Sequence, residues 1–309
     1  MHGAGRAAQA GSHDPAFFYP IFCGGTMEQT LTVNGIAMHV VTEGEGPAVL
    51  LLHGFPDTHA VWRLQIDALV AAGYRVIAPD LRGYGKTEAP ASEDAYAMEV
   101  LRADMVALLD ALGVERALLI GHDWGSVVGW NLCMYAPERV ERFVALSVGH
   151  PAAYTDGGPL QLLKGYYVLV FQLRGIAESL IKAFDWHALR GLASTPRHFE
   201  EWRNHLDRPG RLTAALNYYR ANLKMFNAST WPTVKIPVLG IWSAGDVALT
   251  EAQMRGSEKY VGDSFQYERI EKAGHWLQLE AAPQVNASIL KFLKAEQAGV
   301  QIASRETIP

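Results

Sequence analysis

Hydrophobic residues along this chain follow two alternating patterns. Short, nearly continuous apolar runs such as Ala48–Leu52 are typical of strands buried in a parallel sheet, whereas segments such as Met98–Leu112 repeat their apolar residues with the period of a helix. Strands that alternate with helices predict an α/β fold with a mostly parallel central sheet and helices on both faces. The expected strands are 28–33, 36–42, 48–52, 74–78, 117–120, 140–148, 237–242 and 264–270, and the expected helices are 60–72, 98–112, 127–135, 251–260 and 284–294.

The first two expected strands have a different pattern, in which apolar and polar residues alternate on either side of Asn34-Gly35. Such alternation is typical of strands with one buried face, and Asn-Gly is the strongest short signal for a tight hairpin turn. We therefore expect an antiparallel hairpin at the start of the folded region, which should begin at about Met27.

The pattern changes after Pro151. From there to about Trp231, helical patterns rich in aromatic residues and leucine replace the strand patterns. In open α/β sheets ligands bind at the carboxyl ends of the strands, so a helical block inserted there would cover the binding site. We therefore expect residues 152–230 to form a helical cap, or lid, inserted into an α/β core made of residues 27–151 and 231–294.

Composition and charge narrow the class of protein. The 309 residues are 49% hydrophobic, which is normal for a globular protein, and 27 basic against 32 acidic residues give a net charge of −5. No basic stripe stands out, so we expect no nucleic-acid partner. No apolar run approaches the ~20 residues of a membrane span, so we expect no membrane insertion.

The two ends of the chain and its two cysteines complete this picture. Residues 1–26 contain no uninterrupted apolar signal sequence and are expected to be a flexible N-terminal extension, and residues 295–309 a frayed tail. With Cys23 in that extension and Cys133 in an expected helix, we expect no disulfide and a cytoplasmic location. The sequence leaves a monomer and a homodimer open.

The segment Gly121-His122-Asp123-Trp124-Gly125 joins an expected strand to an expected helix. A Gly-x-Asp-x-Gly turn in this context predicts a nucleophile elbow, with aspartate where commoner versions carry serine. The glycines allow a tight turn that lifts the middle side chain above the edge of the sheet. The alternative is an ordinary surface turn, because glycine and aspartate are common turn residues.

Three titratable residues follow expected strands: Asp123, Asp246 and His275. Their order along the chain is that of nucleophile, acid and histidine in hydrolases with such an elbow. A single aspartate or histidine in a loop is usually a solvated turn residue, but three in this order favour a catalytic triad. We expect Asp123 to be the nucleophile, His275 the general base and Asp246 the acid that orients the imidazole.

An aspartate nucleophile favours a particular reaction. A carboxylate is already ionised near neutral pH, because its ordinary pKa is about 3.9. It can attack a saturated carbon directly and form an alkyl ester, which water activated by His275 then hydrolyses. The backbone N–H groups of Phe55 and Trp124 are expected to bind the oxyanion of this second step. We expect no cofactor, and no metal, because His187, His198 and His205 lack the spacing of metal ligands.

Further motifs surround these residues. They are His53-Gly54-Phe55-Pro56, Asp80–Gly85, Gly121–Gly125, His150-Pro151, Asn217-Tyr218-Tyr219-Arg220 and Gly274–Glu280. Together they resemble the motifs of α/β-hydrolases of the soluble epoxide hydrolase family, over essentially Met27 to Leu293. The resemblance implies an α/β-hydrolase fold with a helical lid, and an enzyme that converts epoxides to vicinal diols with water as the second substrate. The apolar, aromatic-rich residues of the expected lid favour lipophilic epoxides.

In that family, two tyrosines of the lid donate hydrogen bonds to the epoxide oxygen. The resemblance assigns this role to Tyr219 and Tyr167, with Tyr166 as an open alternative to Tyr167, because adjacent residues lie about 100° apart on a helix. Ring opening develops an alkoxide, to which a phenol can donate. We expect the substrate site to be lined by Phe55, Trp124, Phe171 and Trp276.

Two other functions are compatible with these residues. A haloalkane or haloacid dehalogenase would use the same triad, but the halide would need donors where Phe55 stands, and paired lid tyrosines would have no evident task. A non-catalytic binding protein on this scaffold would have no use for His275 and Asp246 together. Epoxide hydrolysis is therefore the favoured hypothesis.

Overall fold

The computed structural model describes residues 25–227, 230–262 and 264–294. Apart from residues 25 and 26, the N-terminal extension expected up to residue 26 lies outside this part of the chain, and so does the tail expected from residue 295. Cys23 is outside it too, whereas Cys133 is a buried free thiol. Met27, where we expect the folded region to begin, is the first residue of the first strand.

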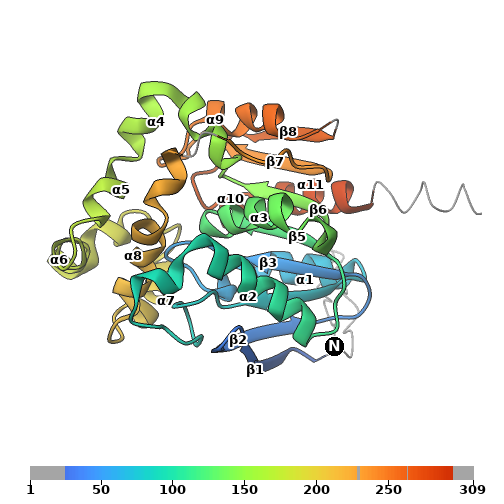
Figure 1. Cartoon of the computed structure of the whole chain (residues 1–309), viewed down its shortest axis with the longest axis horizontal. Helices are drawn as coiled ribbons and strands as arrows, with labels where there is room; N and C mark the ends of the chain where they lie inside the picture. The colour runs from blue at the N-terminus through green and yellow to red at the C-terminus, as the bar shows by residue number, and fades with distance from the viewer. Residues whose placement is uncertain (1–24, 228–229, 263, 295–309) are drawn as a thin grey trace, which may run out of the picture.

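One sheet of eight strands runs through the described part of the chain (Figure 1). The strands are β1 (Met27–Val33), β2 (Ile36–Glu43), β3 (Ala48–Leu52), β4 (Arg75–Pro79), β5 (Ala117–His122), β6 (Val140–Leu146), β7 (Val238–Ser243) and β8 (Phe265–Ile270). Their order is β1-β2-β4-β3-β5-β6-β7-β8. β2 pairs antiparallel with β1 and β4, and the other neighbours pair parallel, which confirms the expected mostly parallel sheet.

The burial of the strands explains why some have continuous apolar runs and others alternate apolar with polar residues. Every residue of β5 is buried, as the apolar run of a central strand requires. β1 lies at the edge of the sheet and is exposed at most of its residues. Between β1 and β2, Asn34 and Gly35 have positive φ angles of 45° and 80°, the backbone of a tight hairpin turn. The expected hairpin is confirmed.

Helices cover both faces of the sheet (Figure 1). They are α1 (Arg63–Ala71), α2 (Met98–Ala111), α3 (Trp124–Tyr135), α9 (Glu251–Gly256), α10 (Leu277–Glu280) and α11 (Ala282–Lys294). α2 packs against α3, and α1 packs against α11. The single helices expected over 60–72 and 251–260 are wrong in one respect, because each is divided into an α-helix and a 3-10 turn. The 3-10 turn His59–Trp62 precedes α1, and the 3-10 turn Ser257–Tyr260 follows α9. Among the helices described, none has the length and apolar character to cross a membrane.

The chain between β6 and β7 folds into further helices. They are α4 (Gly158–Lys164), α5 (Tyr166–Phe171), α6 (Ile176–Arg190), α7 (Pro196–Leu206) and α8 (Arg211–Ala221), called here the α4–α8 segment. These helices lie together beside one end of the sheet (Figure 1). The Tyr218 hydroxyl donates to the carbonyl of Arg82 at 2.8 Å, and His205 donates to the carbonyl of Pro56 at 2.7 Å. The segment is thereby bonded to the loops that follow β4 and β3.

Candidate active site

Asp123 occupies a sharp turn between β5 and α3. Its φ and ψ angles are 52° and −122°, a positive φ that a residue with a side chain rarely adopts. A Cβ atom on Gly125 would lie 1.9 Å from the carbonyl oxygen of Leu52, and one on Gly121 would lie 2.5 Å from that of Gly125. Both glycines are therefore required by the close packing of the turn. α3 begins at Trp124, three residues before the position expected from the sequence, so Asp123 directly precedes the helix.

The three residues of the expected triad meet at one edge of the sheet. His275 Nδ1 lies 2.9 Å from Asp246 Oδ2, and His275 Nε2 lies 3.7 Å from Asp123 Oδ2. Asp123 follows β5, Asp246 follows β7 and His275 follows β8. Because parallel strands end at the same edge of a sheet, residues far apart in the sequence come together there.

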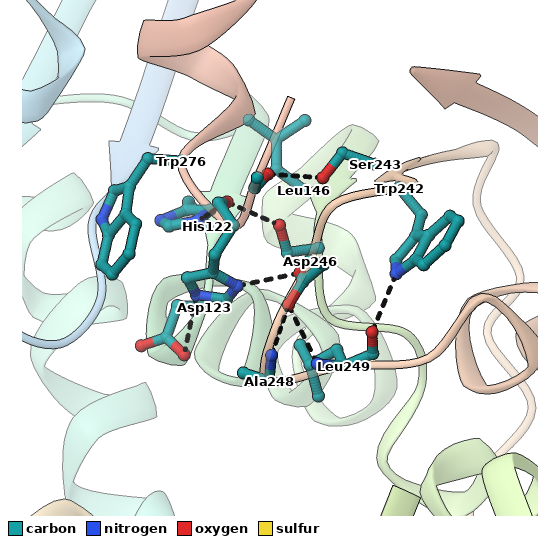
Figure 2. A network of polar contacts seen from close by, with 12 residues as sticks. His122, Asp123, Leu146, Trp242, Ser243, Asp246, Ala248, Leu249 and Trp276 are labelled. Carbon is teal, nitrogen blue, oxygen red and sulfur yellow. Dashed lines mark hydrogen bonds and ion pairs between the residues drawn. The ribbon is translucent and has the colours of Figure 1, made fainter. Parts of the chain in front are cut away.

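Asp246 is a buried carboxylate whose oxygens are all engaged with donors. Asp246 Oδ1 accepts the backbone N–H groups of Ala248 and Leu249 at 2.8 and 2.9 Å (Figure 2). Asp246 Oδ2 faces His275. Burial alone would raise the pKa of Asp246, but His275 and these hydrogen bonds outweigh burial and lower the pKa. Asp246 is therefore an anion that holds the proton of the imidazole on Nδ1.

Hydrogen bonds from two side chains hold the backbone of His275 in place. Its carbonyl oxygen accepts His122 Nε2 at 2.9 Å and Ser147 Oγ at 3.0 Å. Burial, reinforced by the nearby His275, lowers the pKa of His122 to about 4. His122 is therefore neutral near pH 7 and can keep its proton on Nε2 for this hydrogen bond.

Two carboxylates act on the charge of His275. Burial is the largest influence and lowers the pKa of His275, but Asp246 and Asp123 together raise it to about 10. The imidazole is consequently protonated near neutral pH while Asp123 carries its negative charge. A change in the charge of Asp123 must therefore change the ability of His275 to take up a proton.

The loop that follows β3 brings a backbone donor to Asp123. The N–H of Phe55 donates to Asp123 Oδ1 at 2.7 Å. A Cβ on Gly54 would lie 2.3 Å from the same oxygen, so glycine is needed for this approach. Trp124, the second expected donor, is the first residue of α3 and has its N–H at the start of the helix, where backbone donors lack helical partners.

Asp123 borders two cavities of unequal size. The larger, of about 570 Å³, lies between Asp123 and the α4–α8 segment, and the smaller, of about 50 Å³, is lined by Asp123 and by apolar residues of the core such as Val127 and Val148. Of the residues expected to line a substrate site, Phe55, Phe171 and Trp276 line the larger cavity and Trp124 the smaller. Asp123, Tyr167 and Tyr219 line both.

Tyr167 in α5 and Tyr219 in α8 approach each other in the lining of the cavities that Asp123 borders. Their ring centroids are 6.0 Å apart. Burial, and after it the charge of Asp123, holds the pKa of both phenols well above its usual value, so both hydroxyls stay protonated. Tyr166 lines only the larger of the two cavities and is 65% exposed. The geometry therefore favours Tyr167 over Tyr166 as the partner of Tyr219.

Two clusters of polar side chains were not assigned from the sequence. Asp57 accepts hydrogen bonds from His198, Trp202 and Trp276. His39, His59 and Asp80 offer atoms that lie within 4.8 Å of one another, the spacing of possible metal ligands. In this second cluster Asp80 already accepts the two imidazoles and the N–H groups of His59 and Lys86, so it can brace the loop after β4 without a metal.

Comparisons with known proteins agree with this fold. Residues 47–282 match the family model described as alpha/beta hydrolase fold. The chain is 36% identical to the AB hydrolase superfamily protein YfhM of Bacillus subtilis (strain 168), covering 86% of this chain and 97% of that protein. It is 34% identical to epoxide hydrolase 3 of Xenopus tropicalis, covering 85% and 76%. A crystal structure of an epoxide hydrolase from Vigna radiata superposes with a TM-score of 0.77 at 34% identity, covering 87% and 98%.

The charge coupling between Asp123 and His275 can be measured without substrate. Asp123→Asn removes a carboxylate that raises the pKa of His275, so burial is then opposed mainly by Asp246 and the pKa should fall below about 10. NMR titration of the imidazole would measure the shift, with His39, which faces Asp80, as an internal control. An unchanged or higher pKa of His275 would show that Asp123 does not act on it.

Proposed function

This chain belongs to the α/β-hydrolase family, whose epoxide hydrolases it matches over most of its length, and we propose that it hydrolyses epoxides to vicinal diols. The observation that carries the proposal is an aspartate, Asp123, on the turn after β5, with His275 and two tyrosines of the α4–α8 segment around it. An enzyme that attacks an ester or amide would need a hydroxyl or thiol nucleophile at this position.

In the first proposed step, Asp123 attacks a carbon of the epoxide ring. A bond forms between a carboxylate oxygen and the carbon, and the carbon–oxygen bond of the ring breaks. Negative charge then develops on the epoxide oxygen, which takes a proton from Tyr167 or Tyr219. Because Phe55 N–H is bonded to Oδ1, we propose that Oδ2 is the attacking atom.

In the second proposed step, water hydrolyses the ester. His275 takes a proton from the water, whose oxygen attacks the carbonyl carbon of the ester, and passes that proton to the leaving oxygen as the ester bond breaks, so the diol leaves with the oxygen that had belonged to Asp123. The second proton of the water returns to the tyrosine that had protonated the epoxide oxygen, and Asp123 is again a carboxylate. The oxyanion formed at the carbonyl is stabilised by the N–H groups of Phe55 and Trp124. Asp246 stabilises the imidazolium that forms.

The first step prepares the second through charge. When Asp123 becomes an ester it loses its negative charge, and with it goes part of the interaction that raises the pKa of His275. The imidazole then gives up its proton at a lower pH and becomes a base. We therefore expect ester hydrolysis to speed up as pH rises through the lowered pKa of His275.

The two cavities suggest the shape of the substrate. We propose that the α4–α8 segment is a lid, that the cavity of about 570 Å³ holds a large lipophilic group, and that the cavity of about 50 Å³ holds a short substituent on the other side of the ring. The reaction consumes only epoxide and water, so its chemistry calls for no cofactor. We expect it to take place in the cytoplasm, in a monomer or a homodimer.

A panel of epoxides tests the function, and a trapped ester tests its chemistry. Diol should form from lipophilic epoxides such as styrene oxide, and His275→Gln should accumulate a protein adduct one substrate heavier, because ester formation needs no base but hydrolysis does. Mass spectrometry would detect the adduct. Asp123→Asn is the control and should form none. Halide release from haloalkanes, without diol formation from any epoxide, would favour a dehalogenase instead.

The two tyrosines can be tested against a neighbour. Tyr219→Phe and Tyr167→Phe should each slow ester formation, and the double variant should lose on the order of 100-fold or more, because no phenol would then protonate the alkoxide. Tyr166→Phe is the matched control, since its ring is mostly exposed, and should react at nearly the wild-type rate. Rapid-quench measurement of ester formation decides. A double variant that alkylates at the wild-type rate would refute the assignment.

A further inference from the structure

Asp57 is a buried carboxylate to which the proposed reaction assigns no task. It directly follows the His53-Gly54-Phe55-Pro56 motif after β3 and is only 2% exposed. The described residues supply three donors to its side chain. Oδ1 accepts His198 Nε2 at 2.8 Å and Trp202 Nε1 at 2.7 Å, and Oδ2 accepts Trp276 Nε1 at 2.9 Å.

These donors come from two distant parts of the chain. His198 and Trp202 are one helical turn apart on α7, so they face the same side of that helix. Trp276 directly follows His275. Asp57 itself stands two residues after Phe55, whose N–H contacts Asp123. One carboxylate therefore bonds the loop of the oxyanion donor, a helix of the α4–α8 segment and the loop of the proposed base.

The charge of Asp57 suits this arrangement. Burial would raise its pKa, but the hydrogen bond and charge of His198, with further help from Trp202, outweigh burial and lower the pKa. Hydrogen bonds to an ionised acceptor are about twice as strong as those between neutral groups. A neutral side chain of the same shape would leave at least one of these buried N–H donors without an acceptor.

The position of His275 depends on contacts to its backbone and to its imidazole ring. Its own carbonyl is held by His122 and Ser147, while the next residue, Trp276, packs its ring edge-on against the imidazole at a centroid distance of 5.0 Å. Figure 2 shows the indole of Trp276 beside the ring of His122, at a centroid distance of 6.4 Å. A rotation of Trp276 would displace the segment that carries the imidazole, whose Nε2 stands 3.7 Å from Asp123.

We propose that Asp57 is a positioning residue for the ester-hydrolysis step: through the indole of Trp276 it fixes the place of His275, and through α7 it docks the α4–α8 segment onto the same loop. This inference rests on the proposed function. It predicts that changes at Asp57 or Trp276 affect the two chemical steps unequally. Ester formation requires Asp123 and the tyrosines, whereas ester hydrolysis also requires His275 to be correctly placed beside the ester.

Rapid-quench kinetics with styrene oxide would separate the two steps. Trp276→Phe keeps an aromatic ring but removes the indole N–H donor, and Asp57→Asn removes the charge of the carboxylate. Both should slow ester hydrolysis on the order of 10- to 100-fold, the size of effect known for small misplacements of reacting groups, and slow ester formation much less. Trp130→Phe is the matched control, because Trp130 is also fully buried, donates its indole N–H to the Val148 carbonyl at 3.0 Å, and does not itself line either cavity.

The indole N–H signals in NMR spectra provide a second measurement. Asp57→Asn should shift the signals of Trp202 and Trp276 and leave that of Trp130 in place. The inference is overturned if Trp276→Phe slows hydrolysis no more than Trp130→Phe does, a comparison that holds even if Asp57→Asn fails to fold. Absence of any ester in the wild-type enzyme would overturn the proposed function, and this inference with it.

Discussion

The enclosure of one imidazole between two carboxylates is the interaction on which the rest of this site depends. His275 lies 2.9 Å from Asp246 and 3.7 Å from Asp123, and both it and Asp246 are buried. Burial makes an isolated charge costly, so the buried imidazolium of His275 and the buried carboxylate of Asp246 each keep their charge because the other is present. The site can therefore respond to chemistry at Asp123, since loss of that one charge changes the proton affinity of His275.

The backbone must meet strict conditions for this enclosure to exist. Asp123 has a positive φ, and the packing of the turn leaves no room for a Cβ at Gly121 or Gly125. A strained turn persists only where surrounding structure holds it, and here β5 is buried along its length in the middle of the sheet. Because β3 lies next to β5 in the sheet, the loop that follows β3 places Gly54 and Phe55 against Asp123. The fold thus supplies the rigidity that the reacting groups need.

The sequence predicted those features that depend on local signals. The hairpin at Asn34-Gly35, the buried strands and the order of Asp123, Asp246 and His275 each follow from short patterns, and the structure contains these strands and brings the three residues together. The start of α3 was misplaced by three residues, because Trp124, Gly125 and Ser126 do not look like a helix start outside the elbow.

Other features arise from contacts that no local pattern records. Asp57 lies 141 residues from His198 and 219 from Trp276, so nothing in the residues next to Asp57 in the sequence reveals what its carboxylate binds. The cluster of His39, His59 and Asp80 and the small cavity beside Asp123 were missed for the same reason. The choice between Tyr166 and Tyr167 also needed the structure, because both fit the helical pattern and only their surroundings differ.

A single turnover in heavy-oxygen water, with enzyme in excess over epoxide, tests the central claim that Asp123 forms a covalent ester. If Asp123 attacks the ring, the oxygen added to the diol comes from its carboxylate, and water replaces that oxygen only when the ester is hydrolysed. The first diol should then be mostly unlabelled, and mass spectrometry should find the label in the peptide that contains Asp123. Label in the first diol with none in that peptide would mean that water attacks the epoxide directly, and would contradict the account.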